Sequence, residues 1–243
     1  MRVVGVIPAR YGSSRFPGKP LALIHNKPMI QHVYERVSQS RLIDAVVVAT
    51  DHEKIRDAVL AFGGQVVMTR TDHETGSDRM AEVTTKIEGD IYVNIQGDEP
   101  LMSPELIDSI VEVAKNAPGA VVTAKTEIKD IEDIHNPNVV KVISGKNDYA
   151  IYFSRSCVPY NRANKDHIYY KHLGIYSYPK NIINEFVKLP QSPLEEVEML
   201  EQLRLIENGY PIKVLETDYD AVGVDTPEDI QKVEQKLGGK QLV

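Results

Sequence analysis

The 243-residue chain contains only one cysteine, Cys157. A lone cysteine excludes an intramolecular disulfide and leaves no thiolate cluster for a metal ion, which suits a reducing compartment. The chain also lacks any apolar run near the ~20 residues of a membrane span, and it starts without a charged segment followed by an apolar one. We therefore expect a cytoplasmic protein without a membrane partner, and we assign Cys157 no role.

An excess of basic residues is missing as well. Asp and Glu number 35 against 28 Lys and Arg, which gives a net charge of −7. Nucleic-acid binding needs a basic face that displaces the counterions around phosphates, so the sequence argues against it. The hydrophobic share of 42% is ordinary for a globular protein, and we expect one domain over residues 1–243.

Acidic residues are absent before Glu35, the first carboxylate of the chain. Within this region, residues 5–21 read GVIPARYGSSRFPGKPL, with three cations, three glycines and three prolines. A positive potential can therefore persist locally in an acidic protein. The segment is either a solvated basic loop or the binding loop of a strongly negative ligand.

Short β-branched runs alternate with segments of helical spacing, of which Ile30, Val33 and Val37 are one example. The runs are Arg2–Ile7, Ala45–Ala49, Gln65–Met68, Ile91–Ile95 and Ala120–Ala124. Such runs are typical of parallel strands buried on both faces. We predict an α/β fold with a mostly parallel, doubly wound, Rossmann-like sheet, whose ligands bind beyond the carboxyl ends of the strands.

The second half of the chain has a different texture. Strand-like, tyrosine-rich pieces from about residue 139 to residue 178 predict an inserted β-rich subregion. A long helix is expected over Leu194–Asn208, followed by strands over Ile212–Glu216 and Tyr219–Val224. Thr226-Pro227 followed by two carboxylates predicts the start of a last helix.

The basic segment superficially resembles a phosphate-binding P-loop. The Walker pattern needs four residues between its glycines and a Ser or Thr after its lysine. Here five residues separate Gly12 from Gly18, and Pro20 follows Lys19. Because proline removes a backbone donor, we expect an extended ribbon around the ligand in place of a helix cap.

This ribbon still offers the groups that a triphosphate requires. Backbone N–H groups near Ser13 and Ser14, the guanidiniums of Arg10 and Arg15 and the ammonium of Lys19 can all bind phosphate oxygens. The loop also leaves the end of the first predicted strand, where such folds bind ligands. Triphosphate binding is therefore favoured over a solvated loop.

Without a Walker hydroxyl, Mg²⁺ must be held by carboxylates elsewhere. Asp98 follows the predicted strand Ile91–Ile95, and Asp225 follows the strand-like run Tyr219–Val224. Mg²⁺ prefers a few carboxylates together with phosphate oxygens and water. Alone, Asp98 fits a turn and Asp225 a helix cap. Together with the basic ribbon they predict a magnesium–triphosphate site.

Several stretches match one known family in order along almost the whole chain. They are IPARYGSSRFPGKPL (7–21), VATD (48–51), HETGSDR (73–79), NIQGDEP (94–100), YFSR (152–155), HLGIYSY (172–178), LEQLRLIENG (200–209) and GVDTPEDI (223–230). In these stretches the chain resembles the 3-deoxy-manno-octulosonate cytidylyltransferases, or CMP-Kdo synthetases. His52, Ser77 and Cys157 depart from the commonest family pattern.

The resemblance implies that CTP and Kdo react to give CMP-Kdo and pyrophosphate, with Mg²⁺, for lipopolysaccharide biosynthesis. It also implies a homodimer, with the excursion at 139–178 serving sugar binding and dimerisation. The implied catalytic residues are Arg10, Lys19, Asp98 and Asp225, and the last two would bind the metal. The implied nucleotide-binding residues are Pro8, Ala9, Arg10, Ser13, Ser14, Arg15, Lys19, Thr75, Ser77, Gln96 and Asp98. The implied sugar-binding residues are Arg79, Gln96, His172, Tyr176, Glu201 and Gln202.

The sugar side depends most on the resemblance. Arg79 alone would be interpreted as a surface residue, His172 and Tyr176 as a half-buried strand face, and Glu201 and Gln202 as a solvated helix face. A cytidylyltransferase for another acidic sugar, such as amino-Kdo or sialic acid, therefore stays open. A nucleotide-binding module without catalysis is a further alternative, although it would not need two metal-binding aspartates.

Overall fold

The computed structural model describes residues 1–12, 16–73 and 75–238. The strands are β1 (Val3–Ala9), β2 (Leu23–Ile24), β3 (Lys27–Pro28), β4 (Ala45–Thr50), β5 (Val66–Met68), β6 (Ile91–Asn94), β7 (Val121–Glu127), β8 (Lys141–Ser144), β9 (Ala150–Ser154), β10 (Tyr170–Pro179) and β11 (Ile212–Glu216). The helices are α1 (Met29–Val37), α2 (Glu53–Ala61), α3 (Gly76–Lys86), α4 (Pro104–Asn116), α5 (Ile131–His135), α6 (Lys180–Phe186), α7 (Pro193–Glu198), α8 (Gln202–Glu207) and α9 (Pro227–Gly238), with a 3-10 turn η1 over Lys19–Leu21.

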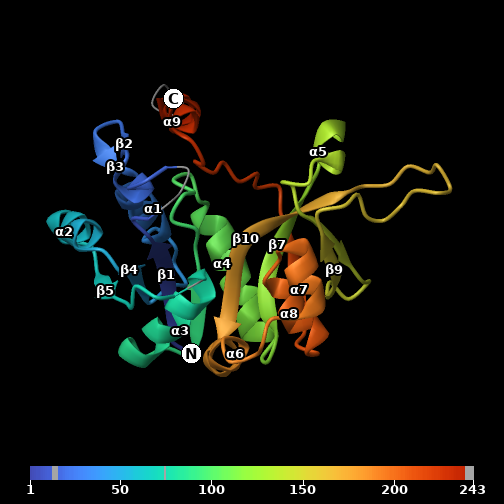
Figure 1. Cartoon of the computed structure of the whole chain (residues 1–243), viewed down its shortest axis with the longest axis horizontal. Coiled ribbons are helices and arrows are strands. Elements are labelled where there is room, and N and C mark those ends of the chain that lie inside the picture. The colour runs from blue at the N-terminus through green and yellow to red at the C-terminus, as the bar shows by residue number, and fades with distance from the viewer. Residues whose placement is uncertain (13–15, 74, 239–243) are drawn as a thin grey trace.

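One large sheet runs through the molecule in the order β11-β7-β10-β6-β1-β4-β5 (Figure 1). The pairs β1–β4, β1–β6, β4–β5 and β7–β11 are parallel. Apolar side chains of α1, α2 and α4 pack on one face, and those of α3, α6 and α8 pack on the other. The predicted α/β fold with a mostly parallel, doubly wound sheet is therefore confirmed.

The inserted β-rich subregion does not stand apart from this sheet. Strands β8 and β9 pair with each other beside it, but β10 lies between β6 and β7 and is antiparallel to both. The last strand of the insertion is thus a central strand of the main sheet. The connection from β9 to β10 extends away from the body (Figure 1).

Two predicted elements in the second half are wrong. The helix expected over Leu194–Asn208 is broken after Glu198, because Met199 adopts left-handed backbone angles, with φ 53° and ψ 48°. The run Tyr219–Val224 is a connection without regular structure. Its end is fixed where the N–H of Val224 donates to the carbonyl of Asp98 at 2.9 Å.

The start of α4 agrees with the capping signal in the sequence. The helix α4 begins at Pro104 and is capped by the Ser103 hydroxyl, which accepts from the N–H of Leu106 at 3.1 Å. The segment after β1, which we expected to be extended, instead forms the 3-10 turn η1 over Lys19–Leu21, with Pro20 in its first positions. Among the described residues, no helix is both long and apolar enough to cross a bilayer.

Candidate active site

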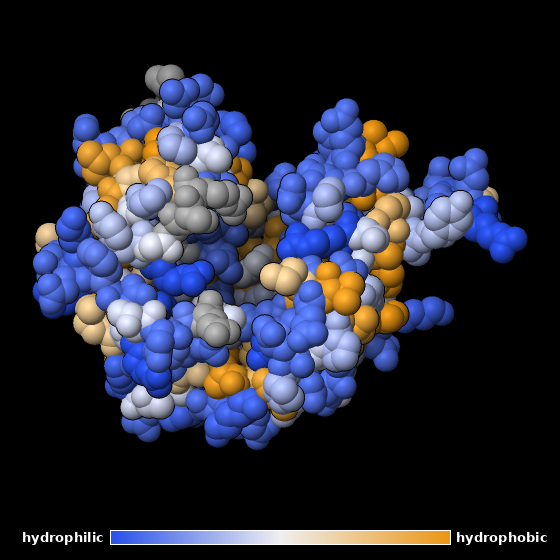
Figure 2. All heavy atoms as spheres, viewed as in Figure 1, coloured by the Kyte–Doolittle hydropathy of each residue, from blue (hydrophilic) through white to orange (hydrophobic). Residues whose placement is uncertain are grey.

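A polar cavity of about 620 Å³ lies at the carboxyl ends of β1 and β6. In Figure 2 it is the hollow at the centre of the face, rimmed mostly by hydrophilic residues. The end of β1 brings Pro8, Ala9 and Arg10 to its wall, and the turn after β6 brings Gln96 and Asp98. Parallel strands of such a sheet place their carboxyl ends, and hence their ligands, at one edge.

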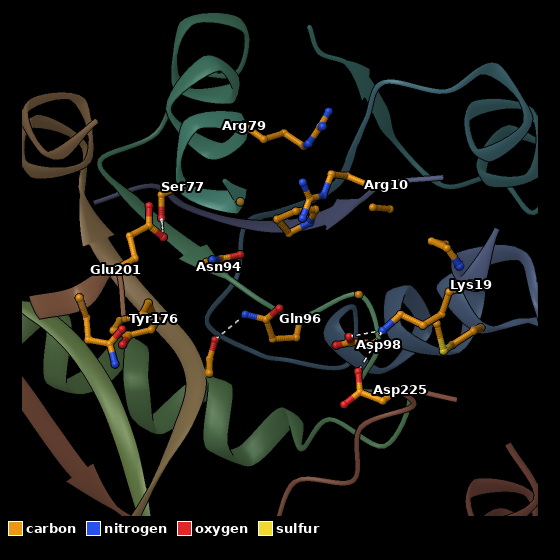
Figure 3. Close-up of a pocket in the computed structure, with 18 of the residues that line it drawn as sticks. Arg10, Lys19, Ser77, Arg79, Asn94, Gln96, Asp98, Tyr176, Glu201 and Asp225 are labelled. Carbon is orange, nitrogen blue, oxygen red and sulfur yellow. Dashed lines mark hydrogen bonds and ion pairs between the residues drawn. The ribbon is translucent and has the colours of Figure 1, made fainter. Parts of the chain in front are cut away.

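Lys19, Asp98 and Asp225 converge at one end of the cavity, as Figure 3 shows. The Lys19 ammonium donates to Asp98 Oδ2 at 2.6 Å and to the carbonyl oxygen of Val224 at 2.9 Å. It also lies 3.7 Å from Asp225 Oδ1. The hydrogen bond from the N–H of Val224 to the carbonyl of Asp98 brings the two aspartates together, although they are far apart in sequence.

This arrangement suits a divalent cation. Asp98 and Asp225 hold a cation, the Lys19 ammonium, between them, and both side chains keep access to solvent, with exposed fractions of 33% and 58%. No cluster of three or more His, Cys, Asp or Glu side chains occurs among residues 1–12, 16–73 and 75–238. Two carboxylates with room for phosphate oxygens and water match what Mg²⁺ prefers.

The structure describes only some of the residues that the resemblance assigns to the nucleotide. Pro8, Ala9, Arg10 and Gly12 line the cavity, whereas the predicted residues Ser13, Ser14 and Arg15 lie outside the described residues. Thr75 directly precedes Gly76 and Ser77, which line the cavity, but Thr75 itself is not part of the lining. Its hydroxyl accepts from the N–H of Asp78 at 3.1 Å and caps α3.

The basic loop is closed by residues that the sequence reasoning missed. The N–H of Gly18 donates to the carbonyl of Tyr11 at 2.8 Å, and the Tyr11 ring stacks on His52 with centroids 4.0 Å apart. Gly18 has a φ of 71°, and a Cβ there would lie 3.3 Å from the Tyr11 ring. The positive φ therefore favours glycine, and the unusual His52 helps to fix Tyr11.

Strand β10 supplies several of the cavity residues that the resemblance assigns to the sugar. His172 and Tyr176 lie on one face as predicted, with ring centroids 5.2 Å apart. Gln96 donates from Nε2 to the carbonyl of Gly174 at 2.9 Å. Tyr176 Oη and Asn94 Oδ1 are buried and have no hydrogen-bond partner within the described part of the chain. Buried polar atoms are rarely left unsatisfied, so these two atoms favour a polar ligand.

Asn94 is a further residue that the sequence reasoning missed. It lines the cavity from the end of β6 and is directly paired with Tyr176 across the strands. Its only signal is a polar side chain that ends the apolar run IYVN. The pair places an amide and a phenol next to each other, a combination that suits a hydroxylated ligand.

Glu201 lies across the cavity from the aspartates (Figure 3), and Gln202 lines the cavity as well. Ser77, which the resemblance assigns to the nucleotide, donates to Glu201 at 3.0 Å, a residue that the resemblance assigns to the sugar. Burial raises the pKa of the Glu201 carboxyl above its usual value. Hydrogen bonding by Ser77 opposes this rise only in part.

Arg79 is fully buried beside the cavity, and its charge already has a partner inside the protein. The guanidinium donates to Asp51 at 2.7 Å and also to the Thr69 hydroxyl. A sugar carboxylate would have to compete with Asp51 for this cation. The Nε of Arg79, however, is buried without a hydrogen-bond partner among the described residues, so a contact between Arg79 and the sugar stays a prediction.

His172 gives a pH-dependent prediction. Burial lowers the pKa of its ring to about 3, whereas an unfolded histidine titrates near pH ~6.5. Below that pH the unfolded chain binds a proton that the folded chain does not, so stability is lost as the pH falls. We expect the unfolding free energy of the wild type to decrease, relative to His172→Gln, by up to about 1.4 kcal/mol per pH unit below pH ~6.5.

Urea unfolding between about pH 7.5 and about pH 5 would measure this difference, since the unfolded ring titrates within that range. His135→Gln is a matched control, because this histidine lies on the short exposed helix α5. Equal pH slopes in the wild type and His172→Gln would contradict a neutral, buried ring.

Comparisons with known proteins give a consistent result. A family model described as "Cytidylyltransferase" matches residues 4–217. The 3-deoxy-manno-octulosonate cytidylyltransferase of Thermodesulfovibrio yellowstonii is 49% identical, over 98% of each chain. That of Fusobacterium nucleatum is 50% identical, over 96% of each chain.

Solved structures resemble the chain as well. A CMP:2-keto-3-deoxy-manno-octonic acid synthetase solved with CTP superposes with a TM-score of 0.95 at 45% identity, over 99% of this chain and 100% of that one. A 4-diphosphocytidyl-2C-methyl-D-erythritol synthase from Anaerococcus prevotii gives a TM-score of 0.64 at 16% identity, over 98% of this chain and 96% of that one. The second likeness concerns the fold alone.

Proposed function

The chain belongs to the 3-deoxy-manno-octulosonate cytidylyltransferase family, and on that premise we propose that it couples CTP and Kdo to give CMP-Kdo and pyrophosphate. The product would serve lipopolysaccharide biosynthesis. The observation that carries the proposal is a single cavity with two unlike ends. Lys19, Asp98 and Asp225 meet at one end, and Tyr176 and Glu201 line the other.

The proposed reaction is an in-line attack by the anomeric hydroxyl of Kdo on the α-phosphorus of CTP. Such transfers depend chiefly on positioning and charge neutralisation. Arg10, directly after β1, and Lys19 both line the cavity. In this proposal Arg10 would offset charge that grows on the α-phosphate, and Lys19 would bind the departing pyrophosphate. Gln96 lies between the two ends and would orient the sugar toward the phosphate.

The residues at the aspartate end fit Mg²⁺, and Asp98 and Asp225 would hold it. When bound, the ion lowers the pKa of a coordinated hydroxyl and screens phosphate charge. The Lys19 ammonium offsets part of the charge of the two aspartates. If Asp98 and Asp225 held the metal, the Lys19 ammonium would be available to bind phosphate oxygens.

The sugar side favours an uncharged polyol chain next to Asn94 and Tyr176. Both unsatisfied atoms lie on neighbouring strands, and His172 beside them stays neutral because burial lowers its pKa to about 3. A neutral, hydroxyl-matched wall suits the hydroxyl groups of Kdo. Amino-Kdo and sialic acid are the competing acceptors.

Pyrophosphate release with CTP and Mg²⁺ tests the proposal. The purified chain would be assayed with Kdo, amino-Kdo and sialic acid at equal concentrations, and kcat/KM compared. We expect the highest value with Kdo. A higher value with another sugar would correct the acceptor, and no release with any of the three would leave a nucleotide-binding module.

We propose further that the protein acts in the cytoplasm, the compartment predicted from its single cysteine. Fractionation of cells, with the chain followed by immunoblotting, would contradict this if the chain were found chiefly in the periplasm or the membranes.

We also propose a homodimer. Large exposed apolar side chains are frequent between residues 149 and 199, where Ile151, Tyr160, Val197 and Met199 are all more than half exposed. A second copy would remove this apolar area from water. Sedimentation equilibrium is expected to give twice the mass of one chain, with Ile151→Lys and Val197→Lys shifted toward a monomer. A monomeric wild type at assay concentrations would contradict the proposal.

A further inference from the structure

The turn between α7 and α8 presents three consecutive residues to the cavity, Leu200, Glu201 and Gln202. It does so only because the chain leaves the helical path at Met199, which is left-handed and 76% exposed. A non-glycine residue in this conformation is strained unless its surroundings compensate. Another part of the molecule must therefore hold the turn.

Arg155, directly after β9, contacts this turn with two of its three guanidinium nitrogens. Its Nε donates to the carbonyl of Glu198 at 2.7 Å, and its Nη2 donates to the carbonyl of Met199 at 3.3 Å. Its Nη1 donates to the carbonyl of Pro137 at 3.0 Å. Arg155 thus satisfies carbonyls that the end of α7 would otherwise leave without partners.

The contact is reciprocal, because the Glu198 carboxylate binds back to the end of β9. It accepts from Ser154 Oγ at 2.6 Å, from the N–H of Arg155 at 2.9 Å and from Tyr152 Oη at 3.3 Å. The stretch YFSR (152–155) therefore contacts the turn through three of its four residues. Neither Arg155 nor Glu198 lines the cavity.

We infer that Arg155 and Glu198 form a positioning clasp that fixes the α7–α8 turn and thereby aims Glu201 and Gln202 at the sugar. The inference rests on the proposed function of this cavity. It gives a role to YFSR, a stretch that no catalytic or binding step uses. The clasp acts through other residues and touches no substrate.

The clasp serves only one end of the site. The nucleotide end is built from β1, η1, the turn after β6 and residues 224–225. The hydrogen bonds that Arg155 and Glu198 make within the described part of the chain go to none of these segments. Loosening the turn should therefore weaken sugar positioning and leave CTP binding unchanged. A general loss of folding would affect both substrates.

Steady-state kinetics of Arg155→Met and Glu198→Gln tests the clasp. Because small misplacements of a positioning group have large effects, we expect the KM for Kdo to rise between about tenfold and a hundredfold. The KM for CTP should stay within about twofold of the wild type, since its contacts are made elsewhere. Arg155→Lys, which keeps the charge and one donor, should recover part of the loss.

Asp108→Asn is the matched control. Like Glu198, Asp108 is a mostly buried carboxylate that accepts from a serine hydroxyl, that of Ser40, and from the backbone N–H of Arg41, but it lies away from the cavity. It should lower the melting temperature without changing the KM for Kdo. An unchanged KM for Kdo in both clasp variants, or a parallel rise for CTP, would overturn the inference.

Hydrogen exchange separates this inference from the proposed function, because it needs no substrate. In Glu198→Gln the amides of residues 199–204 should exchange faster than in the wild type, while those of β6 should not. Unchanged exchange over 199–204 would overturn the clasp. Faster exchange in a protein without pyrophosphate release would retain the clasp and reject the proposed reaction.

Discussion

Asp98→Ala and Asp225→Ala are each expected to lower kcat by at least about a hundredfold, because each removes a ligand of the proposed Mg²⁺, which would offset the charge of the reacting phosphate. CTP should still bind, since both aspartates are anions and repel the triphosphate in the absence of metal. The Lys19 ammonium, now with a single carboxylate partner, is also freer to contact the phosphates. Pyrophosphate release and CTP titration by calorimetry would measure the two effects separately.

Asp220→Ala provides the control for these variants. Asp220 lies on the same connection as Asp225 and pairs with Lys171 at the surface, but it does not line the cavity. Its loss should leave kcat within about twofold, because exposed ion pairs contribute little. Near-normal turnover in either Asp98→Ala or Asp225→Ala would count against the metal-binding pair and against the proposed mechanism.

Local patterns predicted most of the framework. The apolar runs that form β1, β4 and β6 and the helical spacings of α1 to α4 are short-range signals, and the structure confirms them. Because parallel strands end at one edge, these runs were also sufficient to bring Lys19 and Asp98 near each other. The secondary structure of these segments, and the edge of the sheet at which the strands end, could therefore be predicted from the sequence.

The errors share a physical cause, which is contact between distant segments. Leu194–Asn208 has helical spacing throughout, and its local sequence gives no signal for the break that Arg155 and Glu198 stabilise. The place of strand β10 between β6 and β7 was also not predicted, because these two partners are far away in sequence. The role of Arg79 was uncertain for the same reason, since its partner Asp51 precedes it by 28 residues.

Asp51→Ala is expected to lower the free energy of unfolding by roughly 3–5 kcal/mol, the effect of leaving a buried charge without its partner. The Arg79 side chain has no exposed surface, and Asp51 is its only carboxylate partner among the ion pairs of the described residues. The double variant Asp51→Ala, Arg79→Met should regain much of this loss, because it removes the unpaired charge as well. Urea unfolding at pH 7 would measure all three proteins.

Asp57→Ala is the control, since Asp57 pairs with Arg56 on the exposed face of α2 and should cost less than about 1 kcal/mol. An equal effect of Asp51→Ala and Asp57→Ala would show that the Arg79–Asp51 pair contributes little.

Stabilisation by the ligand distinguishes a purely structural role of Arg79 from a role in sugar binding. Because binding to the folded state alone stabilises a protein, Kdo should stabilise wild type and Asp51→Ala equally if Arg79 makes no contact with the sugar. A clearly larger stabilisation of Asp51→Ala by Kdo would mean that its carboxylate reaches the unpaired guanidinium, and would restore Arg79 to the sugar site that the sequence predicted.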